Sequence, residues 1–213
     1  MLDRRATRIV WAFLIGVTAL EGGALFASFR GRGLEGALRY AFAKPATAEA
    51  WAAAAVLMVL YAGYSASASP IIRRHMVSPS RWSGFAAVRL FAIPMALVSG
   101  FFEEAFFRKM LMDVAMNHGA TVSAQIALSA VAFGAVHAVW GVIGGNLRGA
   151  LGAMLATGVL GAALAAVYLL GGRSIGPCIA AHAAINLLLE PWLIIAAATN
   201  GWQARPTPRS AAV

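Results

Sequence analysis

Charged residues are scarce in this sequence, and acidic residues are the scarcest. Only 12% of the 213 residues are charged, and Asp and Glu together number eight. Because a soluble globular domain carries about 25% charged residues, this deficit excludes an ordinary soluble domain. The hydrophobic content of 61% and the long apolar runs indicate a polytopic membrane protein instead.

Cysteine is nearly absent as well. Cys178 is the only one in the sequence, which excludes an internal disulfide and a thiolate metal cluster. We expect Cys178 to act as a small apolar packing residue.

The basic residues outnumber the acidic ones, which gives the chain a net charge of +9. They lie in short segments between the apolar runs, where lipid headgroups account for them. No basic helix or platform of aromatic and basic residues is visible, so we expect no nucleic-acid partner. The bilayer itself is the partner that this charge pattern predicts.

Six apolar segments are long enough to cross a bilayer. They are continuous rather than alternating in hydropathy, so we predict an all-α, polytopic transmembrane helical bundle and not a β-barrel. We expect a single membrane-embedded domain over 1–213, a functional core over about 85–195, and a polar tail at 200–213. The predicted spans are 9–29, 48–68, 85–112, 121–140, 149–170 and 175–199.

The connection 30–45 has basic residues and apolar residues at helical spacing. A helix of this kind is expected to lie flat on the membrane surface.

The third span contains the stretch SGFFEEAFFRKML at 99–111, with four ionisable residues where a span should have none. Each charge at the centre of a membrane helix costs about 2.5 to 3.5 kcal/mol. Glu104 and Arg108 are four residues apart, which predicts an ion pair within the helix. Glu103 points about 100° away around the helix, so its carboxylate needs a partner from another segment.

Two later spans supply candidate partners. His137 lies in AFGAVHAVW, and His182 lies four residues before Asn186 in CIAAHAAINLLL. Since burying such groups singly would cost several kcal/mol each, we expect them to converge. Glu103 could then act as a general base on a water molecule that His137 holds, directly or through a metal. His182 and Asn186 could donate hydrogen bonds to the oxyanion of a scissile carbonyl.

These three motifs, in this order on successive apolar segments, resemble those of the CAAX protease and bacteriocin-processing family (CPBP, or Abi) of intramembrane proteases. The resemblance covers about residues 85–195. It implies an endopeptidase with Glu103 as the water-activating residue, His137 as its partner and an oxyanion site at His182 and Asn186. The matching motifs are Glu103-Glu104-x-x-x-Arg108, Phe133-x-x-x-His137 and His182-x-x-x-Asn186, with Glu104 and Arg108 as supporting residues.

The cofactor is left open by the resemblance, because members of the family have been described both as metalloproteases and as enzymes whose glutamate activates water without a metal. Glu103, His137 and His182 are donors that could complete a zinc site. They are not arranged as His-Glu-x-x-His on one helix. The implied substrate is a membrane-associated protein or peptide, either lipid-anchored or membrane-spanning.

Two other functions fit the same polar cluster. A transporter could use it as a proton or ion relay, but no inverted repeat or pair of broken helices is visible. A self-immunity protein could keep the fold without catalysis, although the intact set of motif residues argues against that. Ion flux without peptide cleavage would favour the first alternative. Biological activity that survives loss of both Glu103 and His137 would favour the second.

The remaining polar residues in apolar segments receive structural interpretations. We expect Glu21 to line the cavity or face a neighbouring helix, and Glu190-Pro191 to mark a kink or a helix end. Asp113 and His118 are expected to be solvated in a short loop. The bias toward Ala, Gly and Arg is typical of bacterial proteins, which predicts a multi-pass protein of the bacterial inner membrane.

Overall fold

The computed structural model describes residues 3–68, 72–73, 86–143 and 145–199, and no strand occurs in these ranges. The predicted polar tail at 200–213 and most of the basic loop at 70–84 lie outside them. The all-α fold class is confirmed. The elements are α1 (Arg4–Ser28), α2 (Gly33–Phe42), α3 (Ala48–Ala68), α5 (Ala86–Glu104), the π-helical segment η3 (Ala105–Met112), α6 (Asp113–Asn117), α7 (Val122–Val136), α8 (Val139–Ile143), α9 (Leu147–Leu170) and α10 (Gly176–Ala198).

Six helical stretches in the described ranges are long and apolar enough to cross a membrane. Their positions agree with the six predicted spans to within a few residues. The protein is therefore an integral, multi-pass membrane protein. The structural spans are Arg4–Ser28, Ala48–Ala68, Ala87–Asn117, Val122–Ile143, Leu147–Leu170 and Gly176–Ala198.

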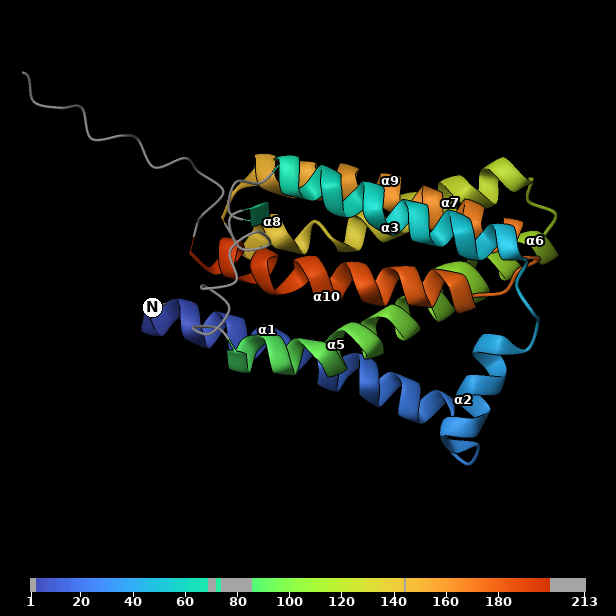
Figure 1. The fold of residues 1–213 in the computed structure, drawn as a ribbon, viewed down its shortest axis with the longest axis horizontal. Coiled ribbons are helices and arrows are strands. Elements are labelled where there is room, and N and C mark those ends of the chain that lie inside the picture. Colours follow the sequence, from blue (N-terminus) through green and yellow to red (C-terminus); the bar gives the residue numbers. More distant parts are fainter. Residues whose placement is uncertain (1–2, 69–71, 74–85, 144, 200–213) are drawn as a thin grey trace, which may run out of the picture.

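Helix α10 forms the centre of the bundle. It packs against α5, α3, α1, α8 and α9, and Figure 1 shows it between α3 and α9 on one side and α1 and α5 on the other. In its most apolar window 56% of the residues are buried, against 17% for α1 and for α3. The functional side chains of α10 are therefore enclosed by the other spans.

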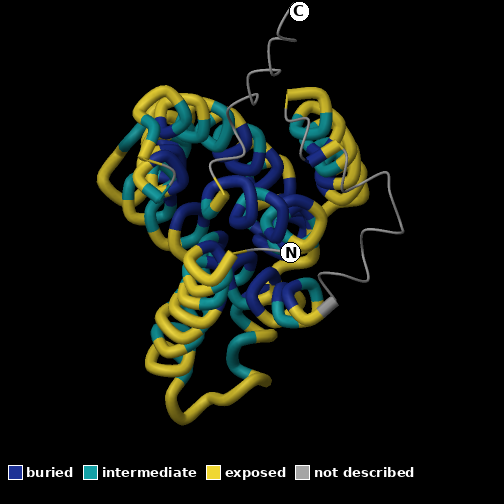
Figure 2. Tube along the Cα trace, turned by 90° about the vertical axis from the view of Figure 1, so that its left-hand side faces the viewer, coloured by how far each residue is buried: buried dark blue, intermediate teal, exposed yellow. Residues whose placement is uncertain are grey.

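Exposed residues follow the outer faces of the helices (Figure 2), and many of them are large aliphatic residues. Leu20 of α1 is 75% exposed and Val131 of α7 is 71% exposed. Exposed apolar side chains on several spans suit contact with lipid tails, because the hydrophobic effect does not penalise them there.

Glycine allows two pairs of helices to approach closely. A Cβ atom added to Gly134 of α7 would lie 2.5 Å from the carbonyl oxygen of Met154 in α9. One added to Gly100 of α5 would lie 3.0 Å from the backbone nitrogen of Ala183 in α10. Such contacts between small residues are a common basis of helix association in membranes. The second contact brings the Glu103-Glu104 pair, one turn after Gly100, next to His182.

The connection predicted to lie on the membrane surface contains helix α2, at the end of the bundle opposite the N-terminus (Figure 1). It exposes Leu34, Leu38 and Phe42, and its Glu35 and Arg39 form an exposed ion pair at 2.6 Å. These features fit an interfacial helix.

Three local expectations need correction. The backbone changes from α- to π-helical geometry at Ala105, directly after the two glutamates, whereas the spacing argument assumed an α-helix throughout. Of the two alternatives for Glu190-Pro191, a kink or a helix end, the end is wrong, because α10 continues through Pro191 to Ala198. Asp113 is not simply solvated.

Asp113 joins three parts of the chain at one end of the bundle. Its carboxylate accepts hydrogen bonds from Tyr168 at 2.8 Å and from Arg173 at 2.5 Å, and it pairs with Lys109 at 3.2 Å. Arg173 also donates to Gln125 at 2.5 Å. The cluster thus fixes the turn between α9 and α10 against α6 and α7.

Candidate active site

The two adjacent glutamates at the end of α5 face different histidines. Oε2 of Glu103 lies 3.8 Å from Nε2 of His137, which follows the last residue of α7. This distance is longer than a direct hydrogen bond, for which about 2.7 to 3.2 Å is usual. Oε2 of Glu103 is buried and has no hydrogen-bond partner. The first glutamate therefore has an acceptor oxygen available for a small molecule.

A hydrogen bond made by the other ring nitrogen of His137 fixes the tautomer of the neutral ring. Nδ1 lies 2.8 Å from the carbonyl oxygen of Phe133. Because a carbonyl oxygen only accepts, Nδ1 must donate, and this tautomer is assigned from the hydrogen-bond pattern. In neutral His137 the proton is then on Nδ1. Its Nε2 presents a lone pair toward Glu103.

Glu104 forms a separate, fully enclosed cluster. Its Oε1 accepts a hydrogen bond from Nδ1 of His182 at 2.7 Å and lies 3.0 Å from Nη1 of Arg108. The side chains of Glu104 and Arg108 are 0% exposed, and that of His182 is 1% exposed. The predicted ion pair between Glu104 and Arg108 is thus present. The contact between Glu104 and His182 was not predicted, and no spacing in the sequence signals it.

The ring of Phe133 packs against Arg108 and both histidines. Its centroid lies 4.4 Å from the Arg108 guanidinium carbon, 4.5 Å from the His137 ring centroid and 5.4 Å from that of His182. Arg108 also donates to the carbonyl oxygen of Gly161 at 3.3 Å. A guanidinium over an aromatic face gains cation–π stabilisation when it is desolvated. Phe133 therefore supports the site by packing and through its carbonyl oxygen, as its motif position suggests.

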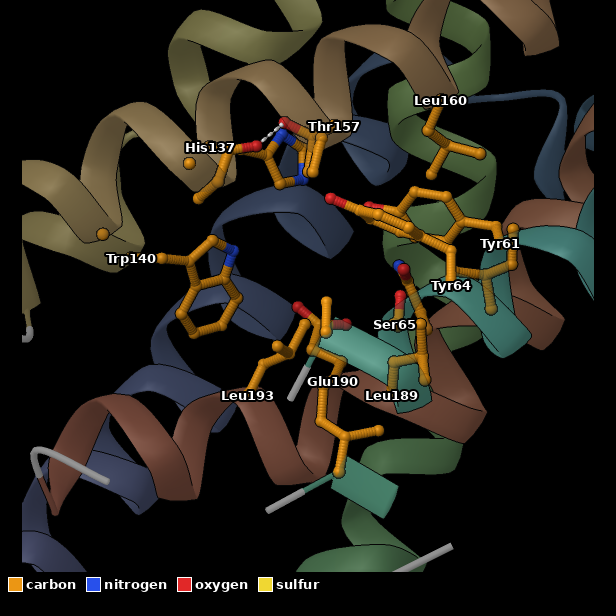
Figure 3. A pocket seen from close by; sticks show the side chains of 18 of the residues that line it. Tyr61, Tyr64, Ser65, His137, Trp140, Thr157, Leu160, Leu189, Glu190 and Leu193 are labelled. Carbon is orange, nitrogen blue, oxygen red and sulfur yellow. Dashed lines mark hydrogen bonds between the residues drawn. The ribbon is translucent and has the colours of Figure 1, made fainter. Parts of the chain in front are cut away.

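A cavity of about 320 Å³ adjoins these groups, and His137, His182 and Asn186 all line it. Its other walls come from α3, α8, α9 and the later part of α10, including Trp140, Thr157 and Leu193 (Figure 3). Glu103 also interacts electrostatically with both His137 and His182. The structure thus brings all four predicted catalytic residues to one region of the bundle. It adds an apolar chamber beside them.

The donor set does not fit the zinc site that the sequence left open as one possibility. Among the described residues, no group of three or more His, Cys, Asp and Glu side chains has the arrangement needed to hold a metal ion. A closed or catalytic zinc site needs at least three converging protein ligands. We therefore derive no step through a metal.

Glu21 approaches the site from α1. It accepts a short hydrogen bond from Ser99, which precedes Glu103 by one turn of α5. Glu21 thus faces a neighbouring helix, one of the two placements expected for it. Ser99 itself is buried and was not singled out in the sequence, because a serine in an apolar segment carries no specific signal.

A family model described as "Type II CAAX prenyl endopeptidase Rce1-like" matches residues 84–188, about half of the chain. The match includes all three polar motifs. The chain belongs to the CAAX protease and bacteriocin-processing family. No curated protein and no solved structure matches it.

Membership in this family makes the chain a protease of the membrane. The family match begins just before α5 and ends within α10, so α1, α2, α3 and the last turns of α10 lie outside it. The part of this CAAX-type protease that carries the motifs is therefore shared with the family. Several walls of the cavity are contributed by helices that the match does not cover.

Proposed function

We propose that this protein is an intramembrane endopeptidase that hydrolyses a peptide bond of a membrane-associated protein, with water activated by Glu103. The supporting observation is the separation of 3.8 Å between Glu103 Oε2 and His137 Nε2. A water molecule placed about 2.8 Å from each atom fits this gap. Both atoms are acceptors in the tautomer described above, so the water donates one hydrogen bond to each. Its lone pair is then directed away from them, toward a substrate.

Glu103 serves as the general base in this arrangement. As the water attacks the scissile carbonyl carbon, one of its protons passes to Glu103, and the same carboxyl can later protonate the leaving amine. His137 holds the water through Nε2. The carbonyl oxygen of Phe133 fixes the ring of His137, so the water position is set before substrate binds.

In this proposal His182 and Asn186 stabilise the oxyanion. Both line the cavity on the same face of α10, one turn apart. His182 donates through Nδ1 to Glu104, and in the imidazolium form its Nε2 would donate to the developing negative charge. The Asn186 carboxamide adds a second donor.

The formal charges of the site residues balance when His182 is an imidazolium. The carboxylates of Glu103 and Glu104 are offset by the Arg108 guanidinium and the His182 imidazolium. An isolated buried charge would cost several kcal/mol. A cluster without net charge avoids most of that cost and still leaves one carboxylate oxygen of Glu103 free for water.

The substrate class follows from the apolar chamber and the bilayer around it. A protein or peptide that is lipid-anchored or membrane-spanning could present a peptide bond at this depth. The bias toward Ala, Gly and Arg supports a proposed location in the inner membrane of a bacterium, where the family name would describe descent rather than a prenylated substrate.

The decisive experiment compares the termini of membrane proteins in cells that express the wild type or Glu103→Gln. A set of new termini should appear with the wild type and vanish with the variant. Glu35→Gln, in the exposed ion pair of α2, is the matched control and should keep them. The proposal is wrong if Glu103→Gln, inserted at the wild-type level, yields the same termini.

A further inference from the structure

Glu190 occupies the cavity in line with the proposed oxyanion residues. His182, Asn186 and Glu190 follow one another at intervals of four residues on α10, and all three line the cavity. With a rise of 1.5 Å per residue, Glu190 lies about 6 Å along the helix from Asn186. It also lies outside the matched segment 84–188. The shared motif region therefore does not assign it a role.

The carboxylate of Glu190 lacks a partner within the described part of the protein. Its Oε2 is buried and accepts no hydrogen bond. The ionisable groups that interact with it electrostatically are Glu103 and Glu21, which are both acidic. A buried carboxylate is costly unless a cation or several donors meet it. Neither is supplied by these neighbours.

Aromatic side chains surround the same space. Tyr61 and Tyr64 of α3 have ring centroids 6.2 Å apart, and they line the cavity together with Trp140 of α8. Figure 3 shows these rings around the part of the cavity that Glu190 enters. The faces of aromatic rings attract cations, and a carboxylate forms charge-assisted hydrogen bonds with them. A carboxylate among aromatic rings is the composition of a cation-binding subsite.

We infer that Glu190 is a specificity-determining residue that binds a Lys or Arg side chain of the substrate near the scissile bond. This inference rests on the proposed function, since it takes His182 and Asn186 as the site of the scissile carbonyl. An extended peptide advances about 3.3 Å per residue. The separation of about 6 Å along α10 therefore places the basic side chain within two residues of the cleaved bond.

The first test needs no variant at position 190. The cleavage sites are the termini that appear with wild-type protein and vanish with Glu103→Gln. Lys or Arg should be enriched within two residues of the cleaved bond, at one fixed position. Sites without any such enrichment would overturn the inference while leaving the peptidase assignment intact. If no terminus depends on Glu103, both proposals fail.

The second test measures the preference directly. Two fluorogenic peptides derived from the commonest cleavage site, one with Lys and one with Met at the enriched position, are assayed with the full-length protein in liposomes. The wild type should prefer Lys by about tenfold or more in kcat/KM, as a hydrogen bond between charged groups implies. Glu190→Gln should reduce the ratio to near one, chiefly by slowing cleavage of the Lys peptide. Glu35→Gln should keep the full ratio.

Charge reversal separates a direct contact from a structural effect. Glu190→Lys should prefer a peptide with Glu at the same position over the Lys peptide. A merely structural Glu190 would lower the turnover of all peptides equally. An unchanged Lys-to-Met ratio in Glu190→Gln would show that the residue is a neutral wall of the cavity, which would overturn the inference.

Discussion

Nδ1 of His182 donates a hydrogen bond to Oε1 of Glu104 at 2.7 Å. The second glutamate of the pair is therefore bound to the histidine of α10, while the first faces His137 at 3.8 Å. Two neighbouring carboxylates thus have different environments: Oε1 of Glu104 meets a guanidinium and an imidazole, whereas Glu103 faces its histidine across a gap too long for a direct hydrogen bond. This difference leads to predictions that distinguish them.

Loss of the Glu104 carboxylate should destabilise the protein. Glu104→Gln leaves Arg108 buried without its counter-ion, which typically costs about 3 to 5 kcal/mol. Glu103→Gln should change stability little, because Oε2 of Glu103 has no hydrogen bond to lose. Thermal unfolding of both variants in the same detergent measures the difference. Equal midpoints for the two would contradict the distinct environments.

The tautomer of His137 is open to direct observation. With Nδ1 donating to Phe133, the neutral ring should carry its proton on Nδ1 and none on Nε2. ¹⁵N chemical shifts of histidine-labelled protein distinguish the two nitrogens, and a His137→Gln variant assigns the signal. A resonance from protonated Nε2 in the neutral ring would exclude the proposed water-holding role.

The close packing of Gly100 against Ala183 should be required for activity, because it sets the distance between α5 and α10. Gly100→Val inserts a branched side chain where even a Cβ atom would lie 3.0 Å from Ala183, so α5 must move away from α10. A displacement of about 1 Å in a catalytic group can cost about 100-fold in rate, and a fall in kcat of that order is expected.

The control for this variant is Gly63→Val in α3, since a Cβ atom at Gly63 would meet nothing within 4 Å. The intrinsic cost of replacing a helical glycine by valine is shared by the two substitutions and cancels. A similar loss of peptide turnover in both variants would mean that the spacing between α5 and α10 is not what matters.

Metal chelation should leave peptide cleavage unchanged. No group of three His, Cys, Asp or Glu in the described residues is arranged to hold a metal, and a catalytic zinc needs three protein ligands. Turnover by the purified protein is measured before and after dialysis against 1,10-phenanthroline. Loss of activity that added zinc restores would require a ligand set different from the one the structure presents.

Much of the fold follows from the sequence alone. The six spans could be placed to within a few residues because continuous apolar runs of bilayer length have few alternatives in a membrane. The pair of Glu104 and Arg108 could also be predicted, since a spacing of four residues within one helix determines which side chains meet. These features depend on residues that are close together in the chain.

The details of the site depend on contacts between segments far apart in the chain. No spacing indicates that His182 binds Glu104, because that choice depends on how α5 rotates against α10 at Gly100 and Ala183. The π-helical turn after Glu104 was missed for a related reason, since its sequence is equally compatible with an α-helix.

Residue types and their order by themselves determined that this chain is a membrane-embedded helical protein with three polar motifs of a protease family. The tertiary structure alone decided which histidine each glutamate faces, and that Glu190 enters the same cavity. The physical reason is that burial and hydrogen bonding of a side chain are set by neighbours from other helices. Their relative rotation and depth result from packing rather than from local sequence.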